Sequence, residues 1–244
     1  MSDVKYSKHK VGQPVIFFPG TLCDERIFNT CWQYLDIPMR AFVPLQWAED
    51  LAQMKMLSTD RLAYFDQPVH LVGFSMGGYI AALTALENQP RVASLTLIGS
   101  ACDALPTSEI TQRKQTLKLI QNKQYKGLSS KQIASNFHPS NQSNVQLQDM
   151  VKHMANDLGA SVLAAQFQAT QARKNLIPQL AKCRFPIQFI LGDQDNVVSD
   201  DAIKGMKQCL PACDYKLVQE AGHMLPIEQP DRLAKLLFQF LTAR

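Results

Sequence analysis

The chain has 244 residues, of which 46% are hydrophobic and 8% aromatic, and this is enough apolar material for one large core. Its length fits one α/β domain with an insertion better than two independent domains. No apolar run approaches the ~20 residues of a membrane span, and no basic stretch is interleaved with aromatic residues. We therefore expect neither a membrane-spanning nor a nucleic-acid-binding protein.

The polar start of the chain, Met1 to Lys10, is followed by no apolar stretch and no small-residue cleavage site. We therefore expect no secretory signal and a cytoplasmic location. The six cysteines form no C-x-x-C pair, and no histidine stands near them at the spacing of a metal site. We expect reduced thiols, with neither a disulfide framework nor a bound metal or cofactor.

Six short apolar runs, each closed by proline, glycine or polar residues, are typical of buried parallel strands. They are residues 14–18, 40–43, 69–72, 94–98, 187–191 and 215–218. Between them, apolar residues recur at helical spacing in residues 25–35, 49–65, 76–87, 200–209 and 230–241. The alternation of strands and helices predicts an α/β fold with a mostly parallel, doubly wound sheet.

The alternation stops once, between about Asp103 and Cys183, where Gln, Lys, Ser and Asn dominate. This stretch has helical patterns but no convincing strand. We predict that residues 104–183 form a helical lid, inserted into a core made of residues 1–103 and 184–244.

A nucleophile motif stands at residues 73–77, in the core segment that precedes the predicted insertion. The segment Gly73-Phe74-Ser75-Met76-Gly77 places a G-x-S-x-G pattern directly after an apolar strand and directly before an alanine-rich helix. In such a turn the serine backbone is strained, and its hydroxyl is held out above the sheet. Only glycine at Gly73 and Gly77 lets the neighbouring chain approach without a Cβ clash. Ser75 is therefore the candidate nucleophile.

A serine hydroxyl needs a base with a pKa near 7 within hydrogen-bond reach, and histidine is the usual choice. Among the five histidines, His223 follows the last predicted strand and precedes the last helix. This places it on a loop at the carboxyl edge of the sheet, where such sites form. We expect the other four to be ordinary surface or core histidines: His9, His70, His138 and His153.

The base in turn needs a carboxylate that fixes its tautomer, and with this motif the chain order is serine, acid, histidine. Two aspartates follow the strand at residues 187–191, in Gly192-Asp193-Gln194-Asp195. Either is placed to lean toward His223. The alternative role of Asp193 is to cap the turn beside Gly192.

Acyl hydrolysis also requires two backbone N–H donors aimed at the developing oxyanion. One is expected from Met76, the residue after the nucleophile. The other is expected from the loop after the first predicted strand, where Thr21 is the first choice and Leu22 the near alternative.

Over essentially its whole length the sequence resembles the α/β-hydrolase family. The resemblance rests on Pro19-Gly20, Gly73 to Gly78, Gly192-x-x-Asp195, and Gly222-His223 followed by Glu228-x-Pro230. In the family the acid commonly stands three residues after that glycine, so the resemblance favours Asp195 over Asp193. Pro19 departs from the usual histidine, which keeps the backbone donor but removes a side chain. A serine nucleophile argues against the aspartate-nucleophile branches, the haloalkane dehalogenases and epoxide hydrolases.

The predicted insertion is basic. Residues 104–183 hold ten Lys and Arg residues against three acidic ones, whereas the rest of the chain holds 15 basic and 18 acidic residues. A concentrated positive field can steer an acidic partner. The alternative is that these side chains only solvate helix faces.

The chain is also similar to carboxylesterases that include the pimeloyl-[acyl-carrier protein] methyl ester esterases of biotin synthesis. This resemblance implies that a basic lid docks an acidic acyl carrier protein, which presents a small acyl ester to the serine. The basic residues predicted to form that docking surface are Arg113, Lys114, Lys118, Arg173 and Lys174.

These features give a main functional hypothesis and two alternatives. The main one is a serine carboxylic-ester hydrolase that works through an acyl-enzyme. The first alternative uses the same triad for thioester hydrolysis or for a lyase step, as in the menaquinone-pathway branch, and an anionic substrate would then want Arg and Tyr inside the pocket. The second is a non-catalytic binding protein on a hydrolase scaffold, which the intact Ser75, Asp195 and His223 disfavour.

Overall fold

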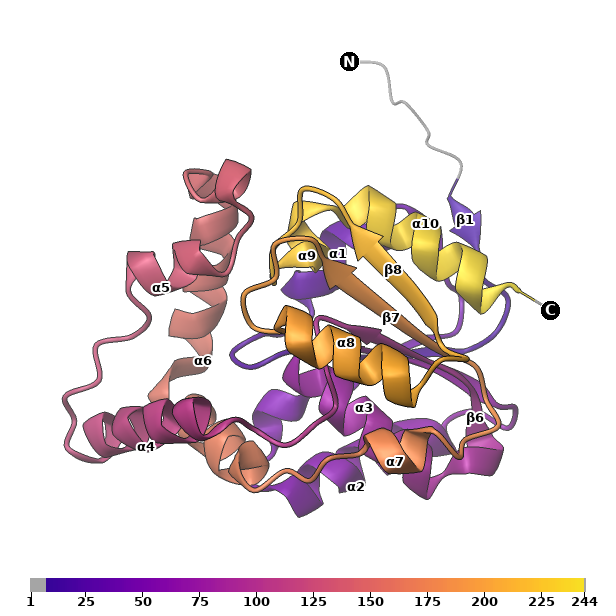
Figure 1. Ribbon diagram of the computed structural model, residues 1–244, viewed down its shortest axis with the longest axis horizontal. Coiled ribbons are helices and arrows are strands. Elements are labelled where there is room, and N and C mark those ends of the chain that lie inside the picture. Colours follow the sequence, from indigo (N-terminus) through magenta and orange to yellow (C-terminus); the bar gives the residue numbers. More distant parts are fainter. Residues whose placement is uncertain (1–7, 244) are drawn as a thin grey trace.

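The computed structural model describes residues 8–243, and Figure 1 shows a central sheet, helices on both its faces and a helical arm to one side. Residues 1–7, and with them most of the segment expected to lack a secretory signal, lie outside the described residues. No helix within residues 8–243 combines the length and the apolar character that a bilayer span requires.

Six parallel strands form the central sheet in the order β4-β2-β5-β6-β7-β8. Their bounds are β2 (Val15–Phe18), β4 (Arg40–Phe42), β5 (Val69–Phe74), β6 (Val92–Ile98), β7 (Ile187–Gly192) and β8 (Asp214–Val218). Each strand predicted from the sequence is present, with one of its two ends shifted by one or two residues. The mostly parallel, doubly wound sheet is confirmed.

The central strands are mostly apolar on both sides because both faces of the sheet are covered. In β2, Ile16 and Phe18 pack into one core cluster, whereas Val15 and Phe17 pack into the cluster on the opposite face. All four side chains are fully buried.

One face of the sheet carries α2 (Leu51–Ala63), α3 (Met76–Glu87) and α8 (Asp200–Cys209), and the other carries α1 (Arg26–Trp32), α9 (Leu225–Glu228) and α10 (Pro230–Leu241). The predicted bounds of α3, α8 and α10 are those observed. The apolar stripes of these helices are buried against the strands. This packing fixes the positions of the loops that connect strands to helices.

The predicted helix at residues 25–35 is wrong at its carboxyl end. The helix α1 ends at Trp32, and β3 (Leu35–Asp36) pairs in parallel with β1 (His9–Lys10) in a separate two-stranded sheet. Two residues are too few to show a strand period, so nothing local in the sequence signals this pairing.

The segment between β6 and β7, all of which the structure describes, contains helices and loops but no strand, and its α-helices are α4 (Thr107–Gln121), α5 (Ser130–Ser135), α6 (Val145–Gln171) and α7 (Ile177–Leu180). We call residues 104–183 the helical insertion. Figure 1 shows α4, α5 and much of α6 standing away from the sheet. Gly159, with φ of 77°, interrupts α6, so this long helix is two helices joined at a kink.

Candidate active site

The turn between β5 and α3 holds Ser75 in a strained conformation, with φ of 53° and ψ of −118°. The Ser75 N–H donates to the Ile98 carbonyl at 2.8 Å and so ties the turn to the neighbouring strand. A Cβ on Gly73 would come within 2.5 Å of the Gly77 carbonyl oxygen, and one on Gly77 would overlap the backbone of Phe18 and Pro19. The turn therefore requires glycine at both positions, and it raises Ser75 at the carboxyl edge of the sheet.

The structure brings Ser75, His223 and Asp195 together at this edge, from the loops after β5, β8 and β7. His223 Nε2 lies 3.0 Å from Ser75 Oγ, and His223 Nδ1 lies 3.1 Å from each carboxylate oxygen of Asp195. The His223 and Asp195 side chains are only 8% and 1% exposed. A proton on Nδ1 facing the carboxylate leaves Nε2 free to accept from the serine hydroxyl.

The Asp195 carboxylate is stabilised in its ionised form. Burial acts to raise the pKa of Asp195, but His223 and the backbone N–H groups of Val197 and Val198 outweigh it, so the pKa lies below its usual value. Those two N–H groups donate to Oδ1 at 2.8 and 3.0 Å. Asp193 has another role, because its Oδ1 accepts the Ala221 N–H at 3.1 Å and braces the loop that carries the histidine.

A further carboxylate, Glu228, holds the loop that carries His223 by hydrogen bonds. It accepts the Gly222 N–H at 2.8 Å, and its second oxygen accepts the His138 backbone N–H at 2.8 Å and the Asn141 side-chain amide at 3.0 Å. Glu228 therefore joins the loop of His223 to the helical insertion. In the sequence, Glu228 stands out only as part of the family pattern that follows Gly222-His223, five residues after the histidine.

Two backbone N–H groups were predicted to face the oxyanion, from Met76 and from Thr21 or Leu22. Thr21 and Met76 both line the cavity beside Ser75. The Leu22 N–H instead donates to the Gln166 side chain of α6, at 2.9 Å. Because this N–H is already engaged, the geometry favours Thr21 over Leu22.

A cavity of about 210 Å³ opens beside Ser75. Its wall includes three charged residues of the insertion, Glu109, Arg113 and Arg173, together with Asp103. Arg113 donates to Glu109 and, at 2.8 Å, to the Thr170 hydroxyl. The cavity therefore combines the serine with ion-paired groups that the helical insertion supplies.

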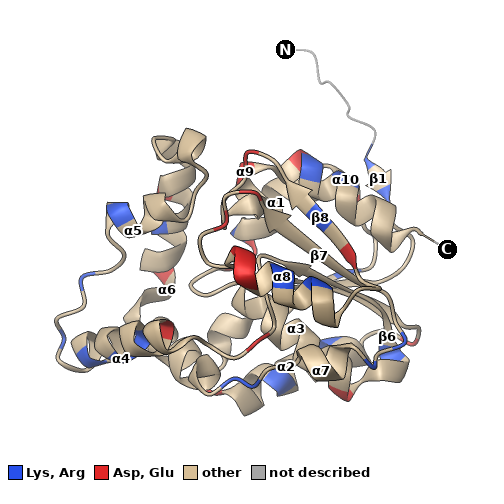
Figure 2. Ribbon diagram, in the orientation of Figure 1, with Lys and Arg blue, Asp and Glu red and all other residues tan. Residues whose placement is uncertain are grey.

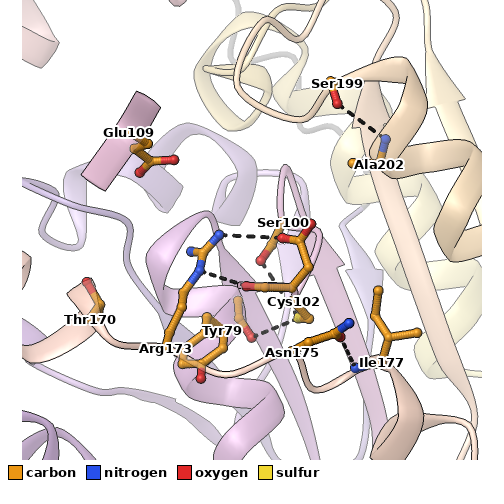
Figure 3. Close-up of polar contacts among 12 residues, drawn as sticks. Tyr79, Ser100, Cys102, Glu109, Thr170, Arg173, Asn175, Ile177, Ser199 and Ala202 are labelled. Atoms are coloured by element: carbon orange, nitrogen blue, oxygen red, sulfur yellow. Dashed lines mark hydrogen bonds and ion pairs between the residues drawn. The ribbon is translucent and has the colours of Figure 1, made fainter. Parts of the chain in front are cut away.

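Arg173 belongs to the same cavity wall. Its Nε donates to the Asp103 carbonyl at 2.9 Å, while its Nη2 lies 3.7 Å from the Asp103 carboxylate. Figure 3 shows the Arg173 guanidinium beside the loop that carries Ser100 and Cys102, with the Tyr79 ring next to the arginine side chain. The guanidinium lies 5.3 Å from the centre of that ring.

The predicted docking surface is wrong in two of its five members. Arg113 is buried and Arg173 is mostly buried, because their charges turn inward to Glu109 and Asp103. Lys114, Lys118 and Lys174 are exposed. Figure 2 shows that the lysines and arginines of α4 and α5 outnumber the acidic residues there.

The remaining histidines lie away from this relay. His70 is buried within β5, where Nδ1 lies 2.7 Å from the Ser94 hydroxyl, and burial lowers its pKa to about 4. His138 and His153 belong to the insertion and His9 to β1. Among residues 8–243, no three or more His, Cys, Asp or Glu side chains cluster in a way that could hold a metal ion.

A family model described as serine aminopeptidase, S33, matches residues 45–230 of the chain. Among curated proteins, the human monoacylglycerol lipase ABHD6 is 26% identical over 194 residues, which cover 72% of this chain and 56% of that protein. The chain thus spans about half the length of the monoacylglycerol lipases that it matches. A 2-succinyl-6-hydroxy-2,4-cyclohexadiene-1-carboxylate synthase of Salmonella arizonae is 24% identical over 226 residues, covering 88% of this chain and 85% of that one.

Among solved structures, a thermophilic esterase from Thermogutta terrifontis superposes with a TM-score of 0.81 at 16% sequence identity. The match covers 95% of this chain and 90% of the esterase. At this identity the likeness is one of fold, and it agrees with the parallel sheet and flanking helices described above.

Proposed function

Because the chain belongs to the serine aminopeptidase S33 family of α/β-hydrolases, we propose that it is a serine hydrolase that cleaves carboxylic esters through an acyl-enzyme. The observation that carries this proposal is the continuous hydrogen-bonded relay from Ser75 through His223 to Asp195. The esterases and lipases among its relatives agree with an ester substrate. The relay supplies a nucleophile, a base and an orienting carboxylate, and these are the groups that acyl transfer requires.

In the proposed acylation step, Ser75 Oγ attacks the ester carbonyl while its proton passes to His223 Nε2. The carbonyl oxygen becomes an oxyanion that accepts the Thr21 and Met76 N–H groups. The carbon–oxygen bond to the alcohol then breaks, and His223 returns the proton to the departing alcohol. Asp195 remains ionised throughout and stabilises the imidazolium.

Deacylation repeats these steps with water in place of the serine. His223 takes one proton from the water as it attacks the acyl carbon, and the tetrahedral intermediate collapses to release the acid and restore the Ser75 hydroxyl. The proton that restores the Ser75 hydroxyl comes from His223, and among the groups of the protein only Ser75 and His223 change their covalent or protonation state.

For the finer substrate, we propose an acyl ester carried on an acidic acyl carrier protein, as in pimeloyl-[acyl-carrier protein] methyl ester hydrolysis. The support is the excess of positive charge on the helical insertion and the exposure of Lys114, Lys118 and Lys174. The insertion also lines the cavity beside Ser75, so a partner bound on it would lie close to the serine. We propose that the insertion acts as a lid in this sense.

One observation favours a second candidate, a lyase or thioesterase that takes an anionic substrate. Arg113 and Arg173 line the cavity, and Tyr79 lies against Arg173. Both arginines already face carboxylates, but the Arg173 Nη2 contact to Asp103 is 3.7 Å, longer than a hydrogen bond. A substrate carboxylate would find an incompletely paired guanidinium there. The Salmonella relative, named as a synthase of a carboxylate, agrees with an anionic ligand at this position.

The experiment that tests the main proposal is hydrolysis of p-nitrophenyl esters from acetate to decanoate, and of an acyl-carrier-protein methyl ester, by wild type and Ser75→Ala. A p-nitrophenol burst, and an acylated Ser75 peptide after acid quenching, are expected from wild type only. Preference for the carrier-linked ester supports the finer substrate, whereas cleavage of small esters alone leaves a general carboxylesterase. Ser75-dependent turnover of an anionic substrate without any acyl-enzyme points to the lyase. Absence of turnover and of fluorophosphonate labelling at Ser75 contradicts both enzymes.

A further inference from the structure

The loop after β2 is held by a side chain from the helical insertion, 144 residues away in sequence. Gln166, in the second half of α6, is fully buried, and its Oε1 accepts the Leu22 N–H at 2.9 Å. Leu22 and Leu163 are both buried and belong to one small apolar cluster, while Arg26 pairs with Asp157 at 2.8 Å. The two halves of α6 are thus joined to this loop and to the start of α1 by a hydrogen bond, a shared apolar cluster and an ion pair.

The loop needs such support because of the conformation of Leu22. The Cys23 N–H donates to the Gly20 carbonyl at 3.2 Å and closes a four-residue turn. Leu22 is the third residue of that turn and has φ of 50°, a region in which glycine or asparagine is usual and leucine is disfavoured. The Gln166 hydrogen bond fixes the orientation of the peptide between Thr21 and Leu22, and so restrains this unfavourable conformation.

That peptide adjoins the proposed oxyanion donor. The Thr21 N–H is one peptide unit before the Leu22 N–H, and Thr21 lines the cavity with Ser75 and Met76. A donor of this kind acts only when it is already aimed at the position that the oxyanion will occupy. We expect that releasing the Thr21–Leu22 peptide would loosen the turn from Gly20 to Cys23, and with it the direction of the Thr21 N–H.

Gln166 is also an unusual choice for a buried site. Its amide nitrogen has no hydrogen-bond partner among the described residues, so only half of the polar group is satisfied. A methionine would fill the same space without leaving a donor unpaired. The polar side chain is explained by its acceptor, which the Leu22 N–H requires.

From these observations we propose that Gln166 is a positioning residue, which aims the Thr21 N–H by holding the Leu22 peptide and so couples the oxyanion site to the docked helical insertion. The proposal rests on the esterase mechanism proposed above. It makes α6 part of the catalytic apparatus as well as a wall of the substrate cavity.

The test compares Gln166→Met, which removes the acceptor, with Gln166→Glu, which keeps an oxygen in its place. Leu163→Ala is the matched control, because it weakens the packing of the same helix against Leu22 and leaves the hydrogen bond. The readouts are the burst-normalised kcat and KM for p-nitrophenyl butyrate, the inhibition constant of a trifluoromethyl ketone, and the rate of fluorophosphonate labelling of Ser75. Normalising to the burst removes any loss of folded enzyme.

For Gln166→Met we expect kcat and the labelling rate to fall about 10-fold or more with KM within about twofold, since only oxyanion stabilisation is impaired. Binding of the ketone, whose adduct carries an oxyanion, should weaken in proportion, and Gln166→Glu should recover most of each loss. Wild-type kcat and labelling in Gln166→Met would overturn the proposal, as would an equal loss in Leu163→Ala. If Gln166→Met does not fold, Gln166→Glu alone tests the proposal. A Gln166→Glu enzyme that folds normally but loses about 10-fold or more in kcat would also overturn the proposal, because its oxygen acceptor is still present. Failure of the esterase mechanism itself is separate, because wild type would then show no Ser75-dependent burst.

Discussion

Asp193 and Asp195 stand two residues apart in one loop, yet their carboxylates face different groups. Asp195 faces His223 and accepts two backbone N–H groups, whereas Asp193 accepts the Ala221 N–H. Both occupy the turn after β7, so exposure and local spacing alone do not separate them. The roles of the two aspartates differ because the loop that carries His223 places the imidazole next to Asp195 and the Ala221 N–H next to Asp193.

Asparagine substitution of each aspartate tests this assignment. Asp195→Asn should lower kcat by about 10³–10⁴-fold, because the neutral amide neither stabilises the imidazolium nor enforces the productive tautomer. Asp193→Asn keeps an oxygen acceptor for Ala221 and should change kcat by no more than a few fold. Steady-state kinetics normalised by active-site titration checks both, and equal losses in the two variants would argue that Asp193 shares the role.

His70 should make the folding stability depend on pH. Burial lowers its pKa to about 4 in the folded protein, whereas an exposed histidine in the unfolded chain titrates near 6.5. The unfolded state therefore binds the proton more readily, so stability is full above about pH 6.5 and falls as the pH drops toward 4. The loss attributable to this one group is about 1–3 kcal/mol.

Urea unfolding of wild type and His70→Gln between pH 7.5 and 4.5 measures this dependence. The variant removes the titrating group and should flatten the decline, although its stability at neutral pH will differ because the contacts to Ser94 and Gln13 change. Parallel pH profiles for the two proteins would show that other groups cause the decline.

At the scale of the elements, the parallel sheet is what gathers the site. The strands β2, β5, β7 and β8 run in one direction, so their carboxyl ends lie at one edge and deliver Thr21, Ser75, Asp195 and His223 there. The close contact of α3 with β2 at Gly77 sets the height of the nucleophile. This contact is a property of two packed elements and not of the serine itself.

Gly77→Ala should therefore be strongly destabilising, by about 1–3 kcal/mol or more, because the added methyl overlaps the backbone at Phe18 and Pro19. It should also lower kcat, since the serine turn must move. The control is Gly205→Ala in α8, where a Cβ meets nothing within 4 Å, and a gain of up to about 1 kcal/mol is expected there. Thermal and urea unfolding measure both, and a stable, fully active Gly77→Ala would contradict the packing argument.

On the scale of the whole molecule, the helical insertion has an excess of basic residues, whereas the rest of the chain has a small excess of acidic ones. Arg113 pairs with Glu109, and the Arg173 side chain turns inward toward Asp103, so the exposed lysines of the insertion are the charges that face outward to a partner. This narrows the proposed carrier-protein surface to the outer side of the insertion.

Alanine substitution of Lys114, Lys118 and Lys174 together should raise KM for a carrier-linked ester by about 10-fold at low salt and leave KM for p-nitrophenyl butyrate unchanged. The control replaces the exposed lysines Lys8, Lys10 and Lys235, which lie on or beside β1 and α10. An equal rise in KM for the carrier-linked ester in the control variant, or a wild-type KM that does not depend on salt, would mean that the insertion lysines are ordinary solvent-exposed residues without a docking role.

The order of the strands along the chain, the helical nature of residues 104–183 and the identities of Ser75, Asp195 and His223 as candidates could all be predicted from the sequence. These depend on short-range patterns, such as apolar runs, the G-x-S-x-G turn, and acid and histidine loops that follow particular strands. Each pattern lies within about ten residues. Because the strands are parallel, the residues that follow them meet at one edge of the sheet, and no long-range sequence signal is needed to predict this.

Only the tertiary structure decided which side chains turn inward. Arg113 and Arg173 read as surface charges in sequence, yet each finds a carboxylate at the cavity, and Gln166 reads as one polar residue among many. The contact of Gln166 with Leu22 joins residues 144 positions apart, and the two-residue pairing of β1 with β3 has no period to detect. Whether a polar group is buried and paired depends on how elements that are distant in sequence pack together, and the local sequence does not predict that packing.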